Sequence, residues 1–94
     1  SIVMEMKQLI SNNYYKIMEV SLSEGEAMPL HQATSDAFII VKEGSGKIIF
    51  SDNEVELHQG STQLIPANKE HRLQINEASK ACIILAPEAT IKFL

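Results

Sequence analysis

Residues 38–50 read Phe38-Ile-Ile-Val-Lys-Glu-Gly-Ser-Gly-Lys-Ile-Ile-Phe50, two runs of mostly β-branched and aromatic residues on either side of a Gly-Ser-Gly segment. Residues of these types fit a pleated surface, whereas glycine supplies the backbone freedom that a tight turn needs. The stretch predicts two strands, 38–42 and 47–50, joined as a hairpin through 44–46. Helical spacing of apolar residues is nearly absent from the chain, so the predicted fold class is all-β.

Short apolar segments separated by turn residues continue along the rest of the chain at intervals of about 8–12 residues, as in all-β sandwiches and barrels. Asp52-Asn53 predicts a second hairpin turn. A single open sheet of about nine such strands would leave its apolar face in water, so we expect a sandwich or a barrel. The further strands are predicted at 54–57, 62–65, 72–75 and 82–85, with weaker ones at 3–9, 14–22 and 91–93.

Alternation along two of these segments assigns the inner face. Val20 and Leu22 fall on one side of their strand and are expected inside the barrel. In the strand at 54–57 the same pattern places Leu57 inside and leaves His58 in solvent.

Length and composition restrict the function classes. A chain of 94 residues with 45% hydrophobic residues is expected to form one globular domain, 1–94. Its net charge is −4, with Arg72 as the sole arginine and no run of lysines, which excludes nucleic acid as an expected partner. No apolar run approaches the roughly 18 residues of a membrane span. The single cysteine, Cys82, fits a reducing compartment, so we expect a cytoplasmic protein that binds no membrane.

Two stretches of the sequence each combine glycine with a histidine, which follows Gly25 by six residues in the first stretch and Gly60 by eleven in the second. The first stretch contains Gly25, His31 and Gly44, and the second contains Gly60, Pro66 and His71. Their spacing resembles the paired motifs of the cupin superfamily over roughly residues 25–85 of this chain. The resemblance implies a cupin-type double-stranded β-helix, or jelly-roll barrel. Asn68 stands where that family has a glycine, and asparagine tolerates the positive φ of such a turn.

The resemblance also implies a degenerate metal site. In the family, two histidines and a glutamate of the first motif and the histidine of the second form a cage for one metal ion. Here His31 and His71 remain, but Ala33 and Ala37 occupy the other two ligand positions. We predict no cofactor; the alternative is a divalent Fe, Mn, Ni or Zn ion on both histidines, with Asp36 as a third ligand. Asp36 lies one residue from the glutamate position, and a bulge would have to turn it inward.

The strand pattern and the resemblance together predict an apolar pocket around the two histidines. The side chains expected to line it with His31 and His71 are Ala33, Ala37, Leu64, Leu73 and Ile75. Such a pocket suits a small organic molecule that carries one polar or anionic group. The principal prediction is a small cupin that binds an organic ligand in its barrel without a complete metal site, and that need not be a catalyst.

Three other interpretations stay open. The first is a metal-dependent enzyme of the dioxygenase, isomerase or decarboxylase type, which uses His31 and His71 with an unrecognised third ligand. The second is a metal-free enzyme in which one histidine is a general base, since an imidazole pKa near ~6.5 lies in the useful range. The third is an interaction role as a homodimer, which the resemblance implies and for which Phe38 and Ile40 offer apolar outward positions.

Overall fold

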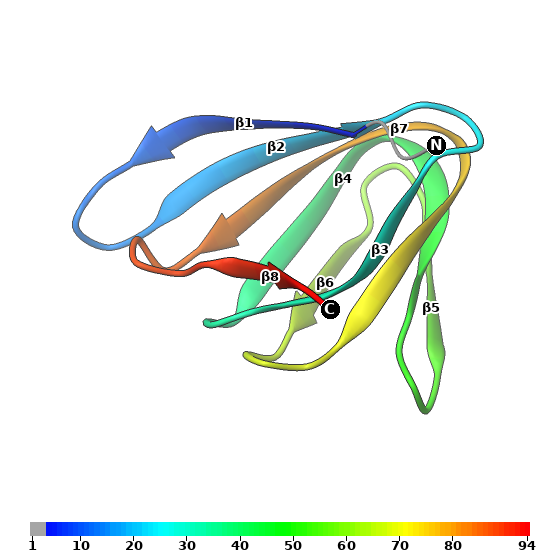
Figure 1. Ribbon diagram of the computed structural model, residues 1–94. Coiled ribbons are helices and arrows are strands. Elements are labelled where there is room, and N and C mark those ends of the chain that lie inside the picture. The colour runs from blue at the N-terminus through cyan, green and yellow to red at the C-terminus, as the bar shows by residue number, and fades with distance from the viewer. Residues whose placement is uncertain (1–3) are drawn as a thin grey trace.

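Strands account for the regular secondary structure of residues 4–94, the part of the chain described by the computed structural model (Figure 1), and none of these residues is helical. This part therefore contains no helix long and apolar enough to cross a membrane. The strands are β1 (Met4–Ser11), β2 (Lys16–Leu22), β3 (Ala27–Ala33), β4 (Ala37–Ile49), β5 (Glu54–Leu57), β6 (Thr62–Ile65), β7 (His71–Leu85) and β8 (Ile91–Phe93). The predicted fold class, all-β, is confirmed.

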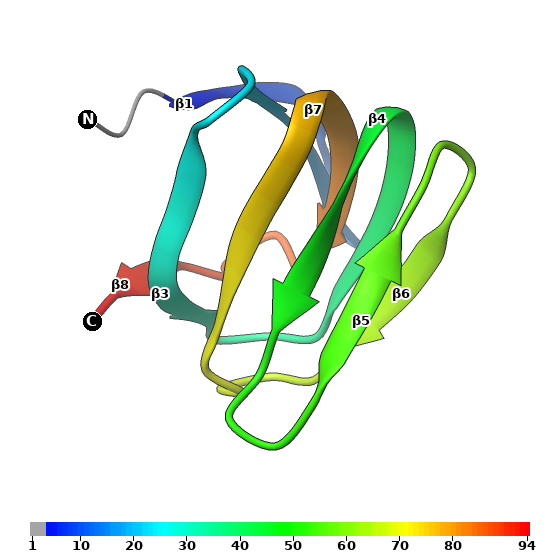
Figure 2. The ribbon, with the colours of Figure 1, turned by 90° about the vertical axis from the view of Figure 1, so that its right-hand side faces the viewer.

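The strands form one curled antiparallel sheet. Its path runs β1-β2-β7-β3-β8, and β4 pairs with β5, β6 and β7. The two longest strands, β4 with 13 residues and β7 with 15, bend together. Figure 2 shows how each of them thereby contributes one half to the upper wall of the barrel and the other half to the side wall. The bend closes the sheet on itself, so that one face is buried and the other faces outward.

The predicted hairpin at 44–46 is wrong, because β4 runs through this segment without turning back. Its pairing with β7 continues on both sides of the bend, with shifts of register between Val41 and Gly46. A Cβ atom on Gly46 would overlap the backbone carbonyl of Gln74, and one on Gly44 would overlap that of Ala78. The two glycines therefore allow the backbones of β4 and β7 to approach closely at a corner of the barrel, instead of forming a two-strand turn.

Two other strand predictions also differ from the structure. The segments 72–75 and 82–85 are parts of one strand, β7, since the residues between them continue to pair with β4 around the bend. The strand β3 was not predicted as a segment of its own, because it contains Pro29 and no β-branched residue. The second hairpin is confirmed: β4 pairs with β5, and the N–H of Phe50 donates to the carbonyl of Asn53 at 2.9 Å.

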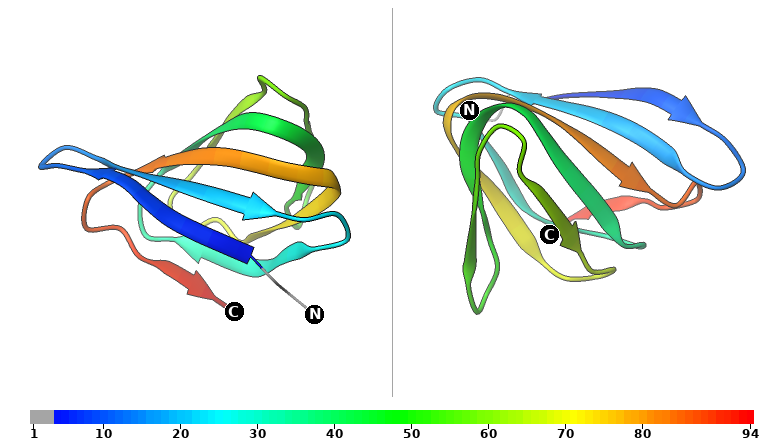
Figure 3. Two further views of the ribbon diagram at one scale, coloured as in Figure 1. Left: turned by 90° about the horizontal axis from the view of Figure 1, so that it is seen from above. Right: turned by 180° about the vertical axis from the view of Figure 1, so that it is seen from behind.

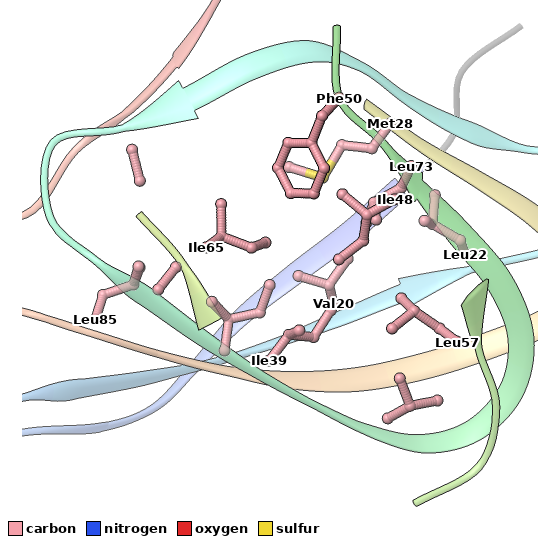
Figure 4. Close-up of a cluster of buried hydrophobic side chains, with 14 of the residues drawn as sticks. Val20, Leu22, Met28, Ile39, Ile48, Phe50, Leu57, Ile65, Leu73 and Leu85 are labelled. Carbon is pink, nitrogen blue, oxygen red and sulfur yellow. The ribbon is translucent and has the colours of Figure 1, made fainter. Parts of the chain in front are cut away.

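The core fills the inner face of the barrel (Figure 4), with Met28, Ile39 and Ile48 as its largest fully buried side chains. The predicted alternation is confirmed, since Val20, Leu22 and Leu57 are buried. The side chain of His58 is exposed, also as predicted. Burial of this continuous apolar face stabilises the barrel, at roughly 25 cal/mol per Å² of apolar surface removed from water.

Candidate functional site

Four rings form a continuous row on the inner face, here called the aromatic row: Phe93 of β8, His31 of β3, His71 of β7 and Phe50 directly after β4. His31 is the register partner of both Phe93 and His71, and cross-strand partners share a face. The two imidazole centroids lie 4.1 Å apart, at an interplanar angle of 60°. Phe93 lies 5.5 Å from His31, and Phe50 lies 5.8 Å from His71. The sheet thus brings the two predicted histidines together between two phenylalanines.

Each imidazole is held by the backbone carbonyl of the residue two positions before it. Both histidines are only 4% exposed. The Nδ1 atom of His31 lies 2.7 Å from the carbonyl oxygen of Pro29, and that of His71 lies 2.8 Å from the carbonyl oxygen of Lys69. A carbonyl oxygen only accepts, so each Nδ1 carries the proton and donates. In a neutral ring this leaves Nε2 unprotonated, as a hydrogen-bond acceptor or a metal ligand.

Burial keeps both rings neutral. The pKa of His31 is lowered to about 4, mainly by burial and to a smaller extent by the neighbouring His71, against the opposing effect of the hydrogen bond to Pro29. Burial also lowers the pKa of His71, against the hydrogen bond to Lys69. At neutral pH the site therefore presents two uncharged imidazoles side by side.

The Nε2 atoms of both histidines remain available as acceptors. No hydrogen bond between residues 4–94 reaches either of them, and no fully buried side-chain nitrogen or oxygen in that range lacks a partner. Each Nε2 atom therefore keeps a small exposed surface, although both side chains are buried. At one end of the aromatic row the Lys69 ammonium covers Phe50, 4.3 Å from the ring centroid. At the other end Phe93 is half-exposed to solvent.

Acidification is expected to destabilise the protein between pH 6.5 and about 4, because His31 is protonated in the unfolded chain across this range but not in the barrel. The unfolded state then binds more protons, so the free energy of unfolding falls as the pH falls. From pH 7.5 to 5.0 the loss through His31 alone is about 2 kcal/mol. Urea denaturation at the two pH values measures it. His31→Gln should remove much of the difference, whereas the exposed His58→Gln should not; an equal pH dependence in all three proteins would contradict this account.

The other predicted pocket residues are divided between the two faces. Ala33, Ala37 and Leu73 are buried on the inner face. Leu64 is not: its side chain is 50% exposed, and it pairs with Phe38 on the outer face of β6 and β4. The prediction that Leu64 lines the interior is wrong because both Leu64 and Ile65 are apolar, and Ile65 takes the buried position.

Leu73 and Ile75 line a separate apolar cavity of about 30 Å³ near the bend of β4 and β7. This volume corresponds to about one water molecule. Neither histidine lines this cavity, and it is too small for an organic ligand. A ligand that contacts the imidazoles would therefore lie outside this cavity.

The structure does not bring Asp36 to the histidines. Its side chain is exposed, and Oδ1 accepts a hydrogen bond of 2.8 Å from the N–H of Ala67. That bond supports the turn before His71, in which Asn68 adopts a φ of 62°, the positive value expected for this position. Within residues 4–94 no group of three or more His, Cys, Asp or Glu side chains is arranged to hold a metal. Since catalytic zinc usually takes three protein ligands, the two imidazoles alone do not fit a tightly held ion.

Phe50 and Phe93 are the parts of the site that sequence reasoning missed. Each lies at or next to a predicted strand, but no local pattern says which residue stands opposite it. Phe93 lies near His31 because β3 pairs with β8, and Phe50 lies near His71 because β4 pairs with β7, so both contacts are properties of the whole sheet.

Comparison with known proteins gives one family and many similar folds. The family model described as "Cupin domain" matches residues 18–87. A solved cupin-2 domain-containing protein from Shewanella frigidimarina is 26% identical, with a TM-score of 0.77 over 87% of this chain and 79% of that one. A cupin superfamily protein from Desulfitobacterium hafniense is 20% identical, with a TM-score of 0.82 over 92% of this chain and 79% of that one. The predicted double-stranded β-helix is thereby confirmed.

An enzyme is among the proteins with a similar fold. The polyketide cyclase RemF from Streptomyces resistomycificus is 18% identical, with a TM-score of 0.84 over 97% of this chain and 70% of that one. At this identity the likeness shows the fold alone. Among curated proteins, none matches the sequence closely enough to count as a relative.

Proposed function

Because this chain belongs to the cupin domain family, whose model spans most of it, we propose that its barrel binds a small organic molecule through the imidazoles of His31 and His71. One observation carries the proposal. Both Nδ1 atoms donate to backbone carbonyls, so two adjacent rings of the aromatic row, with centroids 4.1 Å apart, each keep an Nε2 acceptor. A few fixed polar atoms among apolar walls are the usual make-up of a small-molecule site.

The two Nε2 atoms determine whether the polar group of the ligand should donate or accept a hydrogen bond. Two neutral Nε2 atoms accept hydrogen bonds and donate none. They therefore favour a hydroxyl, amine or amide N–H, whereas a carboxylate would meet two lone pairs. The sequence alone left an anionic group open; the tautomers of His31 and His71 favour a donor group instead.

The apolar side chains around the imidazoles indicate what kind of body the rest of the ligand should have. Phe93 forms the open end of the aromatic row, and the small side chains of Ala33 and Ala37 are buried on the inner face of the barrel. Aromatic rings prefer offset or edge-to-face contacts with other rings. A compact aromatic or aliphatic body with one hydrogen-bond donor is the ligand class we propose.

Phenol and benzoate test this class, because they share a ring and differ in the polar group. Calorimetric titration at neutral pH should give phenol at least about tenfold higher affinity than benzoate, equivalent to about 1.4 kcal/mol. His31→Phe keeps a ring in the aromatic row but removes one of the two Nε2 acceptors, and should reduce the preference for phenol. His58→Phe is the matched control and should keep it. Equal or tighter binding of benzoate, or an unchanged preference in His31→Phe, would overturn the proposal.

A metal-dependent enzyme of the dioxygenase, isomerase or decarboxylase type is the second candidate. A histidine that donates Nδ1–H to a backbone carbonyl and presents Nε2 has the orientation that metal-ligating histidines adopt. His31 and His71 supply two donors, so this function requires the bound molecule to supply the remaining ones. Elemental analysis of purified protein separates the two candidates: near one transition metal per chain, lost in His31→Ala, favours the enzyme.

A further inference from the structure

A tight turn, residues 66–69, leads from β6 towards β7 and supplies the hydrogen-bond acceptor of His71. The N–H of Lys69 donates to the carbonyl of Pro66 at 3.3 Å and closes the turn. Asn68 adopts a φ of 62° at its third position, as a type II turn requires. The carbonyl of Lys69 then accepts the proton of His71 Nδ1 at 2.8 Å. The orientation of the turn therefore decides whether His71 keeps this acceptor.

The loop between β3 and β4 holds the turn from outside the aromatic row. Figure 3 shows this loop beside the one between β6 and β7, at one end of the barrel. The N–H of Asn68 donates to the backbone carbonyl of Ala33 at 2.8 Å. The N–H of Ala67 donates to Oδ1 of Asp36, also at 2.8 Å. Among residues 4–94, Asp36 is the one side chain that accepts a hydrogen bond from the backbone of the turn.

The backbone that carries Asp36 is anchored independently of its carboxylate. Thr34 and Thr90 exchange two hydrogen bonds of 3.0 Å. The hydroxyl of Ser35 accepts a hydrogen bond of 3.1 Å from the N–H of Ala86. Removal of the carboxylate therefore leaves the loop in place and releases only the turn.

We propose that Asp36 is a positioning residue, which fixes the tautomer of His71 by holding the Lys69 carbonyl opposite Nδ1. The tautomer of a histidine is set by the partners of its two ring nitrogens. When the carbonyl moves away from Nδ1, the proton is free to lie on Nε2 instead. The site would then present one acceptor and one donor in place of two acceptors. The consequence for the ligand rests on the proposed function: such a site no longer disfavours a carboxylate.

The ring tautomers in the absence of any ligand test the inference. In a long-range ¹H–¹⁵N spectrum at pH 7, Asp36→Ala should place the His71 proton wholly or partly on Nε2. His31 should keep its proton on Nδ1, because its acceptor, the carbonyl of Pro29, belongs to β3 and not to the turn. A general loss of folding would change both rings, so His31 is the internal reference.

Two further variants separate the hydrogen bond from the charge. Asp36→Asn keeps an oxygen that can accept from the turn, and should retain the wild-type tautomer of His71. Asp52→Ala removes another carboxylate, which lies 4.0 Å from the Lys69 ammonium. No hydrogen bond within residues 4–94 joins the Asp52 side chain to the turn, so this variant should also retain the tautomer.

The ligand preference gives a second measurement. In Asp36→Ala the preference for phenol over benzoate should fall from about tenfold to about threefold or less, and in Asp36→Asn it should persist. A His71 proton that stays on Nδ1 in Asp36→Ala would overturn the inference, as would an equal change of tautomer in Asp36→Asn or Asp52→Ala. The spectra need no phenol, so failure of this inference and failure of the proposed function are distinguishable.

Discussion

Gly46→Ala is expected to destabilise the barrel by about 3 kcal/mol, the upper end of the usual cost of overpacking. The added methyl group would overlap the backbone carbonyl of Gln74, and its next neighbours are the Cα and Cδ1 atoms of Ile75. A backbone carbonyl in a paired strand cannot move away as the end of a flexible side chain can. Since small domains are stable by only about 5–15 kcal/mol, the change should be obvious in urea denaturation.

Gly60→Ala is the matched control. Gly60 has a φ of +87°, but nothing lies within 4 Å of the place where its Cβ would be. Only the conformational cost of a left-handed residue then applies, about 1–2 kcal/mol. If Gly46→Ala cost no more than Gly60→Ala, the close approach of β4 and β7 would be wrong, and the hairpin predicted from the sequence would deserve reconsideration.

Ala33→His combined with Ala37→Glu is expected to raise the affinity for a divalent transition metal by at least about 1,000-fold, or about 4 kcal/mol. Both alanines are buried on the inner face, and Ala33 lies two residues from His31 on the same strand, hence on the same side. The two substitutions would bring the donor set from two to four, at the positions that the cupin resemblance implies. Competition with a chromophoric chelator measures the affinity, and elemental analysis measures the stoichiometry.

Ala33→Gln combined with Ala37→Gln controls for the added volume, since it fills the same positions without an imidazole or a carboxylate. It should leave metal affinity near that of the wild type. Tight stoichiometric metal in the wild-type protein, or no gain in the His/Glu variant, would contradict the view that these two alanines account for the incomplete donor set.

Properties that depend on neighbouring residues along the chain were predictable from the sequence. The alternation of Val20 and Leu22, the solvated His58 and the turn at Asp52-Asn53 each follow from local periodicity or turn chemistry. The proximity of His31 and His71 followed from the resemblance to the cupin motifs, since their spacing alone does not place them on paired strands.

Properties that depend on strand pairing were not predictable. Gly44 and Gly46 have the composition of a turn, and only the pairing with β7 reveals a bend. Leu64 and Ile65 are both apolar, so their sequence does not say which of them is buried. Phe93 completes the aromatic row only because β8 joins the sheet next to β3.

The central claim is that His31 and His71 present two unprotonated Nε2 atoms to a bound molecule. A long-range ¹H–¹⁵N correlation spectrum of the histidine rings, recorded at pH 7 with and without phenol, tests it most directly. The structure predicts that both rings are neutral with the proton on Nδ1, and that both Nε2 resonances shift when phenol is added. A proton on either Nε2, a charged ring at this pH, or Nε2 resonances that phenol leaves unmoved would contradict the claim.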